Sequence, residues 1–173
     1  MAPPDVPPDP LDRFNADPAD RIEESLRACN AAPSFPAAVA AGRPYASADA
    51  LVARAEEVSR SLPWAEVTAA LAAHPRIGDR VAGSSAEATA SRREQSAMGH
   101  AEESVRAALV EGNRAYEDRF DQVFLIRAAG RSAEEMLAEL HRRLGNTAEQ
   151  ERAEVTEQLA QITVLRVKAL VGA

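Results

Sequence analysis

The sequence has few aromatic residues. Phe, Trp and Tyr together make up 4% of the 173 residues, although hydrophobic residues as a whole reach 46%. Strands favour aromatic and β-branched side chains, whereas alanine, which dominates the hydrophobic fraction of this chain, is the strongest helix former. The shortage of aromatic residues therefore disfavours a β-sheet protein and predicts closely packed helices.

The sequence also has only one cysteine, Cys29, which excludes an internal disulfide. A lone cysteine is compatible with a reducing compartment, and we expect Cys29 to be a small buried residue rather than a nucleophile. The N-terminus lacks the basic and apolar segments of a secretion signal, and the C-terminus is not a peroxisomal address. These features predict a cytoplasmic protein.

A net positive charge and long apolar runs are absent as well. The net charge is −7, whereas a nucleic-acid-binding protein needs a basic face to neutralise phosphates. No stretch approaches the ~18 consecutive apolar residues that predict a membrane-spanning helix. We therefore expect neither a nucleic acid nor a membrane as a partner.

Several signatures of known chemistries are absent. His74, His100 and His141 are too far apart to form a usual metal-ligand spacing, so no metal site is predicted. The sequence has no Gly-rich phosphate loop, no Gly-x-Ser-x-Gly turn and no dinucleotide fingerprint. An enzyme with this sequence would have to work by acid–base chemistry and by positioning an anionic substrate.

The chain divides into a short leader and one domain. Residues 1–12 are rich in proline and are predicted to be a disordered leader, and residues 13–173 are predicted to form a single helical domain. Ser47 is expected to cap one helix, and Ser132 and Thr147 begin capping-box sequences. Two helices are expected over 86–97 and 99–119, while the apolar run 123–126 is ambiguous between helix and strand. The pattern predicts an all-α bundle of about seven to eight helices.

His74 is the first polar residue in an apolar position. A helix expected to start at Pro63 carries Val67 and Leu71 on its inner face, and the same spacing brings His74 onto that face. Pro75 then ends the helix. With an ordinary pKa near ~6.5, a histidine in this place could change its protonation state during a reaction. The alternative is a structural histidine that bonds a main-chain carbonyl.

Arg166 is the second such residue. It follows Leu159 and Ile162 on the apolar face of the last helix. A guanidinium keeps its proton, so its burial requires an anion or a route to water. Arg166 is therefore either a clamp for an anionic substrate group or an arginine that reaches solvent or pairs with a structural carboxylate.

Ser91, Glu94 and Gln95 lie on one helical face, at positions i, i+3 and i+4. That face offers a hydroxyl, a carboxylate and an amide together, which suits a polar ligand with several hydrogen-bonding groups. An ordinary solvent-exposed polar face gives the same pattern.

The stretch Ala-His-Pro-Arg-Ile-Gly-Asp at 73–79, followed by Ser91-x-x-Glu94-Gln95, resembles the OHCU decarboxylases, the 2-oxo-4-hydroxy-4-carboxy-5-ureidoimidazoline decarboxylases of urate degradation. The resemblance extends over roughly residues 12–171. It implies an all-α fold, an activity without cofactor or metal, and commonly a homodimer. The implied reaction converts OHCU to (S)-allantoin and CO2.

The resemblance also implies the site residues. The catalytic histidine falls on His74 and the catalytic glutamate on Glu94. The substrate would be bound by Arg166 as a clamp, by main-chain groups of an apolar segment, and by neighbours of the catalytic pair. In full, the implied binding residues are Pro75, Ser91, Gln95, Phe124, Leu125, Ile126, Ala128 and Arg166.

Two alternatives follow from the same residues. One is a related helical enzyme that acts on a different ureido or imidazoline acid. Its only support is that Asp121 and Gln122 replace a glycine–aromatic pair common in the family. The other is a non-catalytic helical interaction module, in which His74, Glu94 and Arg166 would be scattered through the structure.

Overall fold

The computed structural model describes residues 8–79 and 83–173, and within these ranges the chain is helical without a strand. These residues form nine α-helices and one short 3-10 helix. The helices are α1 (Pro10–Ala16), α2 (Ala19–Cys29), α3 (Phe35–Ala40), α4 (Ala48–Arg60), α5 (Trp64–Leu71), α6 (Ala86–Glu94), η1 (Ser96–His100), α7 (Glu103–Phe120), α8 (Ala133–Arg143) and α9 (Ala148–Leu170). The predicted all-α class is confirmed, with slightly more helices than expected.

The expected boundaries differ from the structure at two places. Of the predicted leader, residues 1–7 lie outside the described residues, but Pro10 already starts α1, whose first turn is capped by the Asp9 carboxylate. The helix expected over 99–119 is preceded by the separate turn η1, which ends at His100. The ambiguous run 123–126 forms neither helix nor strand.

The capping signals in the sequence are confirmed. Ser47 accepts a hydrogen bond from the Ala50 amide at the start of α4. Ser132 and Thr147 each form a complete capping box at the starts of α8 and α9. These side chains satisfy amide groups that the first helical turn leaves without partners, so they fix where each helix begins.

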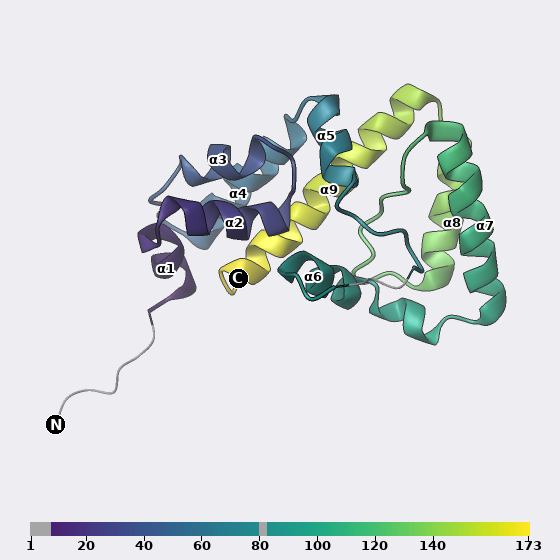
Figure 1. Ribbon diagram of the computed structural model, residues 1–173, viewed down its shortest axis with the longest axis horizontal. Coiled ribbons are helices and arrows are strands. Elements are labelled where there is room, and N and C mark those ends of the chain that lie inside the picture. Colours follow the sequence, from purple (N-terminus) through teal and green to yellow (C-terminus); the bar gives the residue numbers. More distant parts are fainter. Residues whose placement is uncertain (1–7, 80–82) are drawn as a thin grey trace.

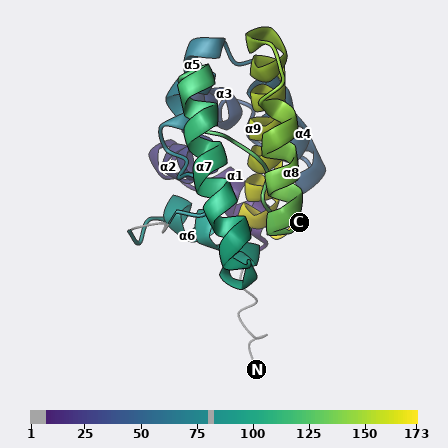
Figure 2. The same cartoon turned by 90° about the vertical axis from the view of Figure 1, so that its right-hand side faces the viewer.

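Helix α9 is the centre of the architecture. Figure 1 shows it running diagonally between a group formed by α1 to α4 and a pair formed by α7 and α8. Figure 2 shows α7 and α8 side by side toward the viewer, with α9 behind them. The C-terminal half of α9 lies close to α2 and α6 (Figure 1). Residues on α9 can therefore contact elements that are far apart in the sequence.

Two hydrophobic clusters form the core, and the buried residues that α9 contributes, such as Val155 and Leu159, belong to the first. One includes Phe35 and Leu51, and the other includes Tyr116. The extended segment after α7 joins them, because Leu125 packs in the first cluster while Phe124 and Ile126 pack in the second. Side chains of an extended chain alternate in direction, so the segment can serve both clusters. This explains why its apolar run was ambiguous between helix and strand.

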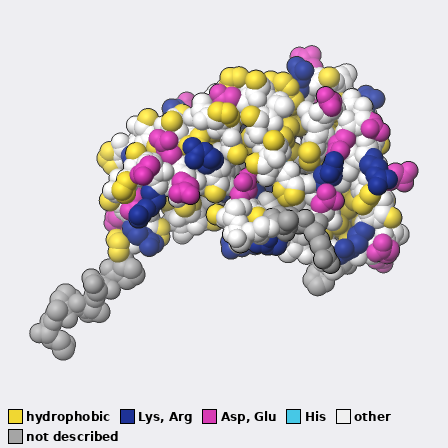
Figure 3. Space-filling model, viewed as in Figure 1, with side chains coloured by type: hydrophobic (Ala, Val, Ile, Leu, Met, Phe, Trp, Pro, Cys, Tyr) yellow, Lys and Arg dark blue, Asp and Glu magenta, His cyan; other side chains and the backbone are white. Residues whose placement is uncertain are grey.

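The surface has mixed charge. Figure 3 shows acidic and basic side chains interspersed over the face that it presents. Val110 and Leu165 are the large hydrophobic residues exposed on the described part of the chain. No helix among the described residues is long and apolar enough to cross a membrane.

Candidate active site

His74 occupies the turn that follows α5. The helix ends at Leu71, whose carbonyl accepts a hydrogen bond from the His74 amide at 3.0 Å. The side chain is buried, with 8% of the residue exposed, as the helical spacing predicted. Pro75, which follows it, is half-buried.

The His74 imidazole is held in its neutral form. Burial, and secondly the positive charge of Arg166, lower its pKa from the ordinary value to about 3. This differs from the expectation of a histidine poised near neutrality, because burial penalises the charged imidazole. No hydrogen bond joins the imidazole to the residues of 8–79 and 83–173, so the main-chain partner of the structural alternative is not found there. In the free protein His74 is a proton acceptor.

Arg166 and Glu94 form a buried ion pair between α9 and the end of α6. The guanidinium Nε lies 2.8 Å from Glu94 Oε1, and Nη2 lies 3.0 Å from Oε2. The exposed fractions of the two side chains are 5% and 12%. Ser91, one turn earlier on α6, accepts a third hydrogen bond from Nη2 at 3.3 Å. Arg166 therefore meets two predicted site residues of α6 that are more than 70 positions away in sequence.

A cavity of about 270 Å³ borders on Arg166. Its walls come from α2, α6 and the last turns of α9, and most of them are apolar. The lining residues are Ser25, Ala28, Cys29, Ala86, Ala90, Arg166, Ala169 and Leu170. The remaining guanidinium nitrogen, Nη1, donates to the Ala28 carbonyl at 3.3 Å. The cavity gives a small anionic ligand room beside the one charged group that lines it.

Cys29, in the wall of this cavity, is a protonated thiol. Burial raises its pKa to about 12, against the opposing effect of Arg166. A thiolate is the nucleophilic form of cysteine. The sequence-based expectation of a small buried residue agrees with this placement.

Gln95 contacts the loop that follows His74. Its Oε1 accepts a hydrogen bond from the Gly78 amide at 3.2 Å. The Ile77 carbonyl, in the same loop, accepts one from Asn113 Nδ2 at 3.0 Å. The loop is thus tied to the end of α6, where Glu94 is located, and to the middle of α7.

The apolar segment 124–128 lies near this loop, and its main chain is held by buried side chains. Phe124, Ile126 and Ala128 pack in the same cluster as Ile77. The Leu125 carbonyl accepts a hydrogen bond from Arg143 at 2.7 Å, and the Arg127 amide donates to Gln158 at 2.8 Å. No hydrogen bond connects these described residues to the Arg166–Glu94 pair. Their contact with substrate remains a prediction.

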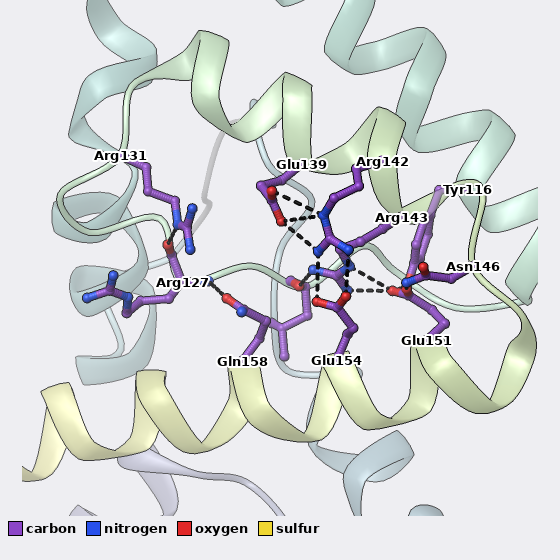
Figure 4. A network of polar contacts seen from close by, with 11 residues as sticks. Tyr116, Arg127, Arg131, Glu139, Arg142, Arg143, Asn146, Glu151, Glu154 and Gln158 are labelled. Carbon is purple, nitrogen blue, oxygen red and sulfur yellow. Dashed lines mark hydrogen bonds and ion pairs between the residues drawn. The ribbon is translucent and has the colours of Figure 1, made fainter.

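A buried polar network was missed by the sequence analysis (Figure 4). Arg143 Nη2 lies 2.5 Å from Glu151 Oε1, and each side chain is 1% exposed. Tyr116 donates its hydroxyl to Glu151, and Asn146 donates to the other Glu151 oxygen at 2.9 Å. The signal that could have found Arg143 is its place after Met136 and Leu140 at helical spacing, on the buried face of α8. The network joins α7, α8 and α9.

Asp121 and Gln122, which depart from the family pattern, border a different hollow. This hollow, of about 370 Å³, lies between α5, the end of α7 and the start of α9, where Ala148 contributes to its wall. Arg166 lies near the other end of α9, a 23-residue helix, and the helical rise puts it about 27 Å from Ala148. The hollow that Asp121 and Gln122 border is therefore separate from the cavity beside Arg166.

The described residues contain no group of three or more His, Cys, Asp or Glu side chains that could hold a metal ion. The candidate site consists of one neutral imidazole, one carboxylate paired with one guanidinium, and the Ser91 hydroxyl and Gln95 amide on the same helix end. Such a set can bind an anion and move protons.

The sequence comparisons agree with each other. The family model described as OHCU decarboxylase matches residues 15–168. A curated 2-oxo-4-hydroxy-4-carboxy-5-ureidoimidazoline decarboxylase from Amia calva is 33% identical over 141 residues. That alignment covers 80% of this chain and 81% of the relative.

Solved structures show the same fold. A crystal structure of an OHCU decarboxylase in the presence of (S)-allantoin superposes with a TM-score of 0.75 at 24% identity, covering 87% of this chain and 99% of the other. A crystal structure of an (S)-allantoin synthase gives a TM-score of 0.70 at 16% identity, covering 93% of this chain and 54% of the other. The helical arrangement described above is therefore shared with proteins of known structure.

Proposed function

The chain belongs to the OHCU decarboxylase family, and on that basis we propose that it converts OHCU to (S)-allantoin and CO2 at the site formed by His74, Glu94 and Arg166. The observation that carries this proposal is the convergence of Arg166, Glu94 and Ser91 through direct hydrogen bonds, with His74 close enough for the Arg166 charge to lower its pKa. The non-catalytic alternative expects His74, Glu94 and Arg166 to be scattered, whereas Glu94 and Arg166 are in direct contact.

Arg166 binds the substrate carboxylate. A guanidinium can hold a carboxylate through two parallel hydrogen bonds, and burial strengthens them. In the free protein Glu94 occupies those same donor atoms. The substrate therefore has to displace Glu94 from at least one of them, and this frees a carboxylate oxygen beside the bound substrate. Ser91 and the Gln95 amide are placed to hold other polar groups of the ring and ureido chain.

The chemistry needs only the substrate's own bonds and one proton from solvent. The bond between the ring carbon and the carboxylate breaks, CO2 leaves, and the electron pair passes through the ring carbon to the neighbouring C=N nitrogen, which takes one proton from solvent. The ring now has an enol, with the former hydroxyl on one carbon of its double bond. Because the substrate accepts the electron pair itself, we propose that no cofactor or metal takes part.

His74 carries the second proton transfer. As a neutral base it accepts the enol hydroxyl proton while the hydroxyl becomes a carbonyl, and it returns that proton to the neighbouring carbon from one face of the ring. Delivery from one face gives one enantiomer of allantoin. Glu94, once released from Arg166, orients the hydroxyl and stabilises the transient imidazolium. Acid–base assistance of this kind contributes roughly 10²- to 10⁴-fold.

The family resemblance extends the proposal to assembly and location. We propose a cytoplasmic homodimer that takes a small anionic substrate. The absence of a membrane-spanning helix among the described residues and the mixed surface charge in Figure 3 are compatible with this proposal. Sedimentation of the purified protein measures the oligomeric state directly.

The activity is tested with OHCU generated freshly from urate. We expect the protein to accelerate the decay of OHCU and to produce optically active allantoin, which circular dichroism follows in real time. Decay at the uncatalysed rate with racemic product contradicts the proposed function.

A further inference from the structure

A single peptide unit, between Ile77 and Gly78, is held from both sides by amide side chains. Its carbonyl oxygen accepts a hydrogen bond from Asn113 Nδ2 at 3.0 Å. Its N–H group donates to Gln95 Oε1 at 3.2 Å. Asn113 belongs to α7 and Gln95 caps the end of α6. Each of the two helices therefore forms one hydrogen bond to the same peptide group.

The clamped peptide sits between the two parts of the site. His74 lies three residues before Ile77, and Glu94 is the residue before Gln95. The Ile77–Gly78 peptide therefore connects two elements. One is the turn that carries the His74 imidazole, and the other is the end of α6, which carries the Glu94 carboxylate.

The surroundings leave the clamped loop little freedom. Ile77 is 5% exposed and packs in the cluster that includes Met98 and Leu109. Gly78 has a φ of +90°, a conformation that side-chain-bearing residues rarely adopt. Asn113 is itself buried, with 4% exposed. A buried carbonyl that loses such a partner is left unsatisfied, so the loop would have to move to regain one.

A second contact from α7 reaches the same loop. Glu117, one turn after Asn113, forms a two-point ion pair with Arg76, with Nη2 to Oε2 at 2.8 Å. Half of the Arg76 side chain is exposed, and exposed ion pairs contribute little to stability. The buried amide of Asn113 is therefore the main polar attachment of this loop to α7.

We propose that Asn113 is a positioning residue for decarboxylation, which together with Gln95 fixes His74 relative to Glu94 through the Ile77–Gly78 peptide. This inference rests on the proposed function. It also gives the Gln95 amide two functions. Its Oε1 accepts the hydrogen bond from the loop, and its Nε2 donates to the substrate. A displacement of about 1 Å at a catalytic group can cost on the order of 10²-fold in rate.

The test is Asn113→Ala, with Asn146→Ala as the matched control. Asn146 also donates one side-chain hydrogen bond, but it does so to Glu151, in the network of Figure 4 that joins α7, α8 and α9. We expect Asn113→Ala to lower kcat by roughly 10- to 100-fold with little change in KM, and Asn146→Ala to leave both unchanged per folded molecule. Asn113→Ser, which can donate through its hydroxyl, should recover part of the loss.

The pH dependence separates positioning from mere stability. If the loop shifts and exposes His74, its pKa rises toward the ordinary value, so the acid limb of kcat/KM moves to higher pH in Asn113→Ala. A variant that is only less stable keeps the wild-type limb. Wild-type kinetics in folded Asn113→Ala, or an equal loss in Asn146→Ala, overturns the proposal.

Hydrogen exchange on the wild-type protein tests the clamp without any variant. The Gly78 amide should exchange slowly, as a bonded group does, even if Asn113→Ala and Asn113→Ser fail to fold. Exchange at the rate of a free loop amide overturns the clamp. Because this measurement involves no substrate, its result is independent of whether the protein acts on OHCU.

Discussion

In the proposed function, the pairing of Glu94 with Arg166 makes the Glu94 carboxylate a competitor of the substrate for the same guanidinium. The two side chains share two hydrogen bonds in a nearly buried position. The attraction between buried charges is offset by their desolvation, and removing one partner leaves the other charge uncompensated. A substrate carboxylate can take over this pairing without leaving Arg166 unpaired at any stage.

Glu94→Gln should therefore separate binding from turnover. The amide cannot pair with Arg166 as a charge, so the substrate meets less competition and we expect KM to fall or stay level. Loss of the carboxylate beside the hydroxyl should lower kcat by roughly 10²- to 10⁴-fold. Steady-state kinetics measures both values, and Glu103→Gln, at the exposed start of α7, is the matched control. A large rise in KM with normal kcat would show that Glu94 only binds substrate.

The inward direction of the main site residues could be predicted from the sequence, because helical spacing fixes which face a residue occupies. His74 and Arg166 followed apolar residues at helical intervals, and both are buried. Their partners could not be predicted in this way. The Arg166–Glu94 pair, the Asn113 hydrogen bond to Ile77 and the lowered His74 pKa depend on how distant helices meet, and a periodic pattern carries no such information.

The end of α7 shows what local rules do and do not determine. Asp121 adopts a left-handed conformation with φ of 53°, and its amide bonds back to the Glu117 carbonyl. This is the usual way for a helix to end, and glycine is the residue best suited to it. The family's glycine at this place thus has a structural explanation, and the aspartate that replaces it ends the helix in the same left-handed conformation.

Asp121→Gly should accordingly stabilise the protein modestly. Glycine removes the strain of the left-handed conformation, which stabilises the folded protein, but it also gives the unfolded chain more conformational entropy. Because the first effect is slightly larger, we expect the free energy of unfolding to rise by about 0.5–1 kcal/mol. Denaturant unfolding measures this change, and turnover should be unaltered because the residue borders a hollow that Arg166 does not line. A loss of stability would mean that the aspartate side chain contributes more than its backbone strain costs.

Among the elements, the helices with strong start signals were predicted best. The capping boxes at Ser132 and Thr147 form as expected. The segment 123–126 and the turn η1 were predicted poorly, because tertiary packing determines their conformation. An apolar run that serves two core clusters has no single periodicity to detect.

At the scale of the whole molecule, α9 brings the site together. Its C-terminal half carries Arg166 to α2 and α6, while its N-terminal half anchors α7 and α8 through Glu151 and Glu154 (Figure 1). The fold class was predictable from alanine content and helical periodicity, since these determine helix formation directly. The arrangement of the helices around α9 was not, because it depends on contacts between residues far apart in the sequence.

The central claim is that His74, with Glu94 and Arg166, forms the decarboxylating site. The most direct measurement follows fresh OHCU by circular dichroism with equal amounts of folded wild-type protein and His74→Asn. We predict rapid formation of (S)-allantoin with the wild type, and decay at the uncatalysed rate to racemic allantoin with the variant. Near-normal turnover to optically active allantoin by folded His74→Asn would contradict the claim.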